Sequence, residues 1–84
     1  MEYPILTTRQ LAQTLKGWRK SRKLTQAGAA LRVGMRPKTI SVLESEPDSS
    51  TLGSLFKLLS ALEVELVIRP KSKVTGGAAA TGEW

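Results

Sequence analysis

Two short helical patterns meet at a glycine within residues 24–44, and this feature constrains the fold of the chain more than any other. Thr25 offers a hydroxyl that can cap the first helix, and Gly34 supplies the positive φ that ends it without steric strain. Pro37 suits a first helical turn, and its ring pushes Arg36 into the cap position. We therefore predict a helix over about residues 25–33, a turn at 34–36 and a second helix over about 37–44.

The outer face of the second predicted helix is polar and basic. Ile40 and Leu43 are three residues apart and are expected to point inward. The outward or marginal positions are then Lys38, Thr39, Ser41 and Val42. Arg36 and Lys38 stand at the exposed start of the helix. Two short helices with such a face have the form of a DNA-reading helix-turn-helix.

Basic residues concentrate in and beside this motif. No acidic residue lies between Glu2 and Glu44, whereas nine of the thirteen lysines and arginines do: Arg9, Lys16, Arg19, Lys20, Arg22, Lys23, Arg32, Arg36 and Lys38. Such a basic surface binds duplex DNA favourably, because its cations release the counterions condensed on the phosphates. A basic surface kept for solubility is the alternative. The overlap of charge and motif favours nucleic acid, with Lys16 expected to bind phosphates whatever the base sequence.

The composition limits what else the chain can do. Its 84 residues make one small domain that is marginally stable alone, and dimerisation is one source of added stability. Cysteine and histidine are both absent, which removes disulfides, thiolate metal sites and the commonest general base. We expect no enzymatic activity, no metal and no cofactor. Neither a signal peptide nor an apolar run of about 18 residues is present, so we expect no membrane association and a cytoplasmic, nucleoid-associated protein.

Two further helices are predicted on either side of the motif. The first opens at Thr7 or Thr8 with a Thr7–Gln10 capping box, and its apolar stripe is Leu11, Leu15 and Trp18. Trp18 is predicted to lie in the core, with stacking on nucleic acid as the alternative. The second begins near Ser50 or Thr51, after a turn-rich connector. Its stripe is Leu52, Leu55, Phe56, Leu59 and Leu62.

After the last helix the hydrophobic period changes to two. Val64, Leu66 and Ile68 alternate with other residues until Pro70, which predicts one short strand. Its partner must be residues 1–6 or another molecule, and symmetric pairing between two copies is the economical solution. The predicted fold is therefore an all-α bundle of four to five helices plus one C-terminal β-strand used in an intersubunit two-stranded sheet.

We predict a domain over residues 1–69 and a flexible tail over residues 70–84. The tail is small and polar and holds two adjacent glycines. Trp84 is the exception in it, either as an anchor for a pocket on another protein or as an incidental residue.

Several motifs resemble a known family. The run LTQ at residues 24–26, the Gly34 turn, TIS at 39–41 and Glu44 are similar to phage-repressor-like, or Xre, helix-turn-helix domains, over roughly residues 8–62. A narrower resemblance is to HipB-type antitoxins. It extends through the segment at residues 51–66, the strand, and the closing Glu83 and Trp84.

The resemblance implies a homodimer that binds an inverted-repeat operator in its own promoter and neutralises a HipA-like serine/threonine kinase toxin. It implies that Arg19 and Glu44 form an ion pair, that Val64, Leu66 and Ile68 pair in the dimer, and that Trp84 reaches the toxin. The expected DNA-binding set is Lys16, Thr25, Gln26, Arg36, Lys38, Thr39 and Ser41.

The chain departs from the family at Gly28, Ala29 and Ala30, where a Glu-Leu-Ala run is usual, so a core leucine is missing. Two other functions stay open at this point. One is a stand-alone Xre-type regulator without a toxin, which differs only in the role of the strand and the tail. The other is a non-DNA protein adaptor that uses the basic face on acidic protein or RNA.

Overall fold

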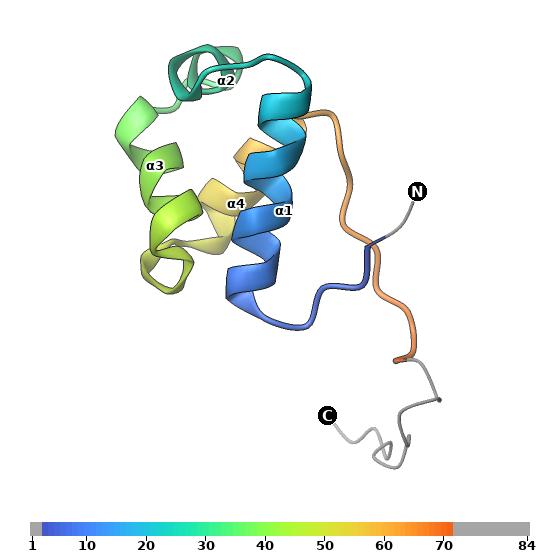
Figure 1. Cartoon of the computed structure of the whole chain (residues 1–84). Helices are drawn as coiled ribbons and strands as arrows, with labels where there is room; N and C mark the ends of the chain where they lie inside the picture. The colour runs from blue at the N-terminus through green and yellow to red at the C-terminus, as the bar shows by residue number, and fades with distance from the viewer. Residues whose placement is uncertain (1–2, 72–84) are drawn as a thin grey trace.

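A computed structural model describes residues 3–71 of the chain. Its elements in order are α1 (Thr8–Ser21), α2 (Gln26–Arg32), α3 (Pro37–Ser45), the 3-10 helix η1 (Pro47–Ser49) and α4 (Leu52–Ala61). The helices surround one core, and α4 lies behind α1 and α3 in the view of Figure 1. The all-α prediction of four to five helices is confirmed. No helix within residues 3–71 is long and apolar enough to cross a membrane.

Threonine hydroxyls begin three of the four α-helices. Thr7 accepts a hydrogen bond from the amide of Gln10 (3.0 Å), and Thr25 accepts one from Gly28 (2.9 Å). Thr51 caps α4 in the same way. Each bond satisfies one of the amides that a first helical turn leaves without a partner. At α3 the cap position has no side-chain bond, but Pro37 has no amide hydrogen to satisfy.

The predicted capping box at α1 is only half right. The side-chain oxygen of Gln10 accepts from the amide of Leu6 (2.7 Å) and not from that of Thr7. Thr7 is extended, with φ −138° and ψ 161°, and the Gln10 side chain reaches past it to the preceding amide. The bond therefore fixes how the N-terminal segment enters α1.

The inner face of α4 forms the centre of the core. Leu58 and Leu62 are fully buried, together with Ile40 of α3, and Ala29 and Ala30 of α2 pack against them. The small alanines bring α2 close to α4, and the half-buried Trp18 and Met35 complete the cluster. The core therefore forms without the leucine that the family usually has in α2.

Two residues of the predicted α4 stripe face outward instead. Leu52 is 72% exposed and Phe56 is 51% exposed. A helix turns by about 100° per residue, so a face centred on Leu55, Leu58, Leu59 and Leu62 leaves Phe56 on its flank and Leu52 at its open end. The prediction chose the wrong boundary of the face because it omitted Leu58.

Trp18 joins the end of α1 to the end of α4. It packs against the core, as predicted, and its indole N–H donates to the Leu62 carbonyl (3.3 Å). The guanidinium of Arg22 lies 5.1 Å from the ring centroid and also contacts the carboxylate of Glu63 (3.3 Å). These contacts account for Trp18 without a role in stacking on nucleic acid.

The segment after α4 forms no strand within the described residues. The amide of Val64 bonds to the carbonyl of Leu59 (3.0 Å), and beyond it the chain runs irregularly to residue 71. Ile68 is 87% exposed. Residues 3–7 form no strand either, so no strand pairing joins the two segments within the described residues. The intersubunit strand stays a prediction, and the tail after residue 71, with Trp84, lies outside the described residues.

Candidate nucleic-acid interface

A tight turn sets α3 against α2. Gly34 has φ +65°, the positive value that the sequence predicted, and the amide of Met35 bonds back to the carbonyl of Ala30 (2.9 Å). Ile40 and Leu43 are the buried residues of α3. Because both anchors lie on one side of a nine-residue helix, the opposite side is presented to solvent.

The N-terminal ends of α3 and α4 enclose a shallow groove of about 270 Å³. Two cations, an aliphatic residue and five hydroxyls line it: Arg36, Lys38, Thr39, Val42, Ser49, Ser50, Thr51 and Ser54. No acidic side chain is among them. Helix N-termini carry unpaired amides and a partial positive charge, so two of them beside two cations suit an anionic ligand such as a phosphate.

A buried ion pair braces the base of α3. The Arg19 Nε and the Glu44 Oε2 are 2.6 Å apart, and a second bond joins Nη2 to Oε1 (3.0 Å). The side chains are only 8% and 3% exposed. Arg19 also donates to the carbonyl of Leu24 (2.7 Å), which lies in the connector before α2. One guanidinium therefore fixes α1, the start of α2 and α3 relative to one another.

Gln26 shares the same carboxylate. Its side-chain nitrogen donates to the Glu44 Oε1 (3.1 Å). Burial alone raises the pKa of Glu44, but hydrogen bonds from Arg19 and Gln26 and the charges of Arg19 and Lys16 outweigh it, so the pKa lies below its ordinary value. The hydrogen bond to Glu44 in turn raises the pKa of Arg19 against the opposing effect of burial. The pair is therefore fully charged at neutral pH.

The structure divides the expected DNA-binding residues into two groups. Arg36, Lys38 and Thr39 line the groove. Gln26 and Lys16 belong instead to the surroundings of Glu44, because Gln26 bonds to it and the charge of Lys16 acts on it. The remaining two residues lie outside both groups, since the hydroxyl of Thr25 caps α2 and Ser41 is half-buried on α3.

Sequence reasoning missed the groove residues from the connector and α4. The pattern predicts only a turn and a helix cap at Ser49, Ser50 and Thr51, and it indicates no role for Ser54. Their signal was the run of hydroxyl residues at positions 49–51, which stands directly before a helix start. Val42 was placed on the outer face but given no role.

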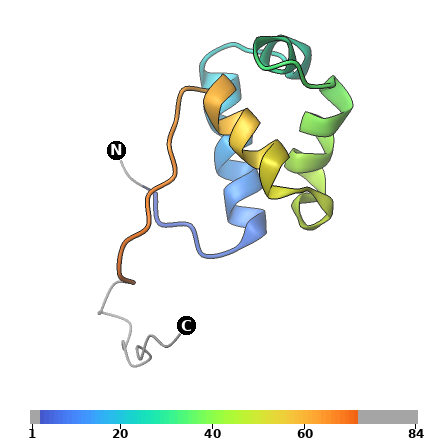
Figure 2. The same cartoon turned by 180° about the vertical axis from the view of Figure 1, so that it is seen from behind.

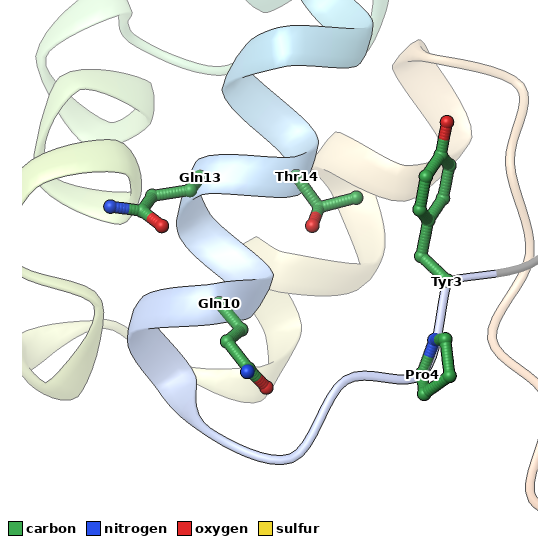
Figure 3. Close-up of a pocket in the computed structure, with 5 residues that line it drawn as sticks. All are labelled: Tyr3, Pro4, Gln10, Gln13 and Thr14. Carbon is green, nitrogen blue, oxygen red and sulfur yellow. The ribbon is translucent and has the colours of Figure 1, made fainter.

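A second groove lies beside the N-terminal half of α1 and holds none of the expected residues. Figure 3 shows Tyr3 and Pro4 of the N-terminal segment beside α1, which contributes Gln10, Gln13 and Thr14. Its volume is about 320 Å³ and its lining is uncharged. Within residues 3–71, no cluster of three or more Asp, Glu, His or Cys side chains is placed to hold a metal ion.

Comparison with known proteins points to one group. The family model HTH_3, described as helix-turn-helix, matches residues 15–68. Antitoxin HipB of Escherichia coli strain K12 is 36% identical over 64 residues, which are 76% of this chain and 73% of that protein. Antitoxin HipB of Escherichia coli O6:H1 is 34% identical over the same length, covering 76% of this chain and 68% of the relative.

Solved structures agree. A structure of a HipB-O4 20mer complex superposes with a TM-score of 0.82 at 32% identity, over 84% of this chain and 100% of that one. A structure of a HipA-HipB-O2-O3 complex gives the same TM-score, identity and coverage.

Replacing Glu44 by glutamine should destabilise the fold. The variant leaves the Arg19 charge buried without a counter-charge, and breaking such a pair costs about 3–5 kcal/mol of unfolding free energy. Urea denaturation at pH 7 measures the loss. The matched control is Glu63→Gln, which removes the exposed pair with Arg22 and should cost less than about 1 kcal/mol. Equal losses for the two variants would contradict the bracing role.

The same pair makes stability dependent on pH. Because the pKa of Glu44 in the folded state lies below the ordinary value of 4.5, the unfolded chain takes up this proton first as the pH falls. The stabilisation that the ionised Glu44 provides is complete above the unfolded-state pKa of about 4.5. It is lost as the pH falls through the lower pKa of the folded state. The difference between the wild-type chain and Glu44→Gln should therefore shrink in acid.

Proposed function

The chain belongs to the HipB family of helix-turn-helix antitoxins, and from this premise we propose that it is a homodimeric repressor of its own promoter that neutralises a HipA-like serine/threonine kinase toxin. The observation that carries the DNA half of the proposal is the groove between α3 and α4, with its two cations and two helix N-termini. The HipA-HipB-O2-O3 complex supports the toxin half. We place the protein in the cytoplasm, at the nucleoid.

The helix α3 contacts the bases of the operator. In a dimer, two copies of α3 enter successive major grooves about 34 Å apart, so the operator is an inverted repeat. Lys38 and Arg36 donate to guanine edges, while Thr39 and Ser41 read a neighbouring base or methyl group. The hydroxyl of Ser50 faces the phosphates that flank the reading helix, whereas that of Thr51 caps α4.

The residues around Glu44 bind the DNA backbone. One N–H of the Gln26 amide is taken by Glu44, which leaves the other to donate to a phosphate. Lys16, on α1, adds a contact that does not depend on base sequence. Thr25 contributes to DNA binding through its main-chain groups and not through its side chain, because its hydroxyl already caps α2.

Two copies pair through the segment after α4. Val64, Leu66 and Ile68 share one face of an extended chain, and Leu66 and Ile68 are exposed in the single molecule. Pairing with the same segment of a second copy supplies a strand partner, which no other part of residues 3–71 provides. The domain over residues 1–69 is thus completed by its copy.

Trp84 anchors the toxin. It is a large aromatic residue in a stretch of small and polar ones, and such residues contribute most of their binding energy by filling a partner's pocket. A stand-alone regulator of the same family would have no use for this residue. A non-DNA adaptor would show no sequence-selective footprint on duplex DNA.

Lys38→Ala should weaken binding to the operator about tenfold or more while leaving binding to random duplex nearly unchanged, because a bidentate contact to a guanine is worth about 1–3 kcal/mol. Lys16→Ala is the control for general attraction. It should weaken binding to both duplexes alike and lower the slope of log affinity against log salt by about one. Fluorescence anisotropy at several salt concentrations measures both effects. If Lys38→Ala loses the same fraction of its affinity for the operator and for the random duplex, Lys38 contacts a phosphate and not a base.

Leu66→Lys should break the dimer into monomers. In the paired strands, the two lysines would lie close together on the same face of the two-stranded sheet. Their repulsion adds to the cost of losing an exposed leucine. Val67→Lys is the matched control, since residue 67 lies on the other face of an extended chain. Sedimentation velocity distinguishes the two variants. A Leu66→Lys protein that sediments as the wild-type dimer would exclude this interface.

Deletion of Trp84 should spare folding and dimerisation and weaken binding to the HipA-like kinase by about 2 kcal/mol or more, the range of an anchor residue. Trp84→Phe, which keeps an aromatic ring, should recover part of the loss. Isothermal titration calorimetry against the kinase gives the affinities. Unchanged affinity after deletion would refute the anchor.

A further inference from the structure

Val42 is the only aliphatic side chain in the lining of the groove between α3 and α4. It lies one helical turn after Lys38 and Thr39, which line the same groove, and is itself half-buried. Cations and hydroxyls make up the rest of the lining. A branched apolar residue is therefore held at a surface that otherwise suits an anion.

The hydrophobic core does not account for Val42. Ile40 and Leu43 supply the buried anchors of α3. Val42 is neither a member of the core cluster nor one of the half-buried residues packed against it, a group that includes the other half-buried valines of residues 3–71, Val33 and Val64. Its two methyl groups are thus available to a ligand of the groove.

We propose that Val42 is a specificity-determining residue that contacts the C5-methyl group of a thymine in each operator half-site. Valine has no donor or acceptor, and the thymine methyl is the one apolar group that base edges present in the major groove. This inference rests on the proposed function, because it assigns one base preference within the operator that α3 reads.

Helix geometry places this thymine near the base that Lys38 reads. One turn of α-helix rises 5.4 Å, and successive bases are 3.4 Å apart. The thymine therefore lies within about two base pairs of the guanine contacted from Lys38. A guanine and a thymine at that spacing are the expected signature of each half-site.

The test begins with selection of bound sequences from a randomised duplex library by the full-length chain. In the selected duplex, each thymine is then replaced singly by deoxyuridine, which removes only the methyl group. For the wild-type protein, each half-site should contain one thymine whose single replacement weakens binding about fourfold. This loss is the equivalent of one buried methyl group. For Val42→Ala, the same replacement should have no further effect.

Val33→Ala is the matched control, because it removes the same atoms from a half-buried valine outside the groove. It should keep the full sensitivity to deoxyuridine, and circular dichroism confirms that each variant is folded. A fourfold loss that persists in Val42→Ala, or a half-site with no methyl-sensitive thymine, overturns the inference but leaves operator binding intact. A library that yields no selected sequence overturns the proposed function and this inference with it.

Discussion

The bidentate pair between Arg19 and Glu44 is the interaction on which the rest of the arrangement depends. Both side chains are nearly excluded from water, and a buried pair of this kind contributes little net stability because desolvation offsets the attraction. Its value lies in geometry. Arg19 also holds the Leu24 carbonyl and Glu44 also holds Gln26, so the pair sets the angle at which α3 meets α1 and α2.

The proposed DNA-reading surface follows from that angle. With Ile40 and Leu43 held in the core, α3 brings its N-terminal end beside the N-terminal end of α4, and the two helix ends give one groove rather than two separate surfaces. The side chains there combine charge, hydroxyls and one aliphatic contact. Rigid support beneath a polar, solvent-facing edge is what base discrimination requires, because a misplaced donor loses most of a hydrogen bond's value.

Local signals were the part of the fold that could be predicted from the sequence. Thr25 as a cap, the positive φ of Gly34 and the first-turn position of Pro37 each depend on neighbours within a few residues, and the structure has all three. Local signals could not predict the side to which Phe56 points, because that side depends on how Leu58 packs against α2 and α3. The groove itself depends on the approach of two helix ends whose sequences are ten or more residues apart, so neither segment alone reveals it.

The junction at the end of α4 sets the direction in which residues 64–71, the C-terminal arm, leave the helices. Glu63 adopts φ +59°, and the bond from Trp18 to Leu62 holds the preceding residue against α1. The chain then leaves on the side of α1 that is remote from α3 (Figures 1 and 2). In the proposed function, a toxin bound to this arm approaches from the side of α1 that is remote from the groove between α3 and α4. Under that proposal, DNA and toxin occupy the molecule at once, and each contact that the toxin adds to the DNA-bound assembly is thermodynamically linked to retention on the promoter.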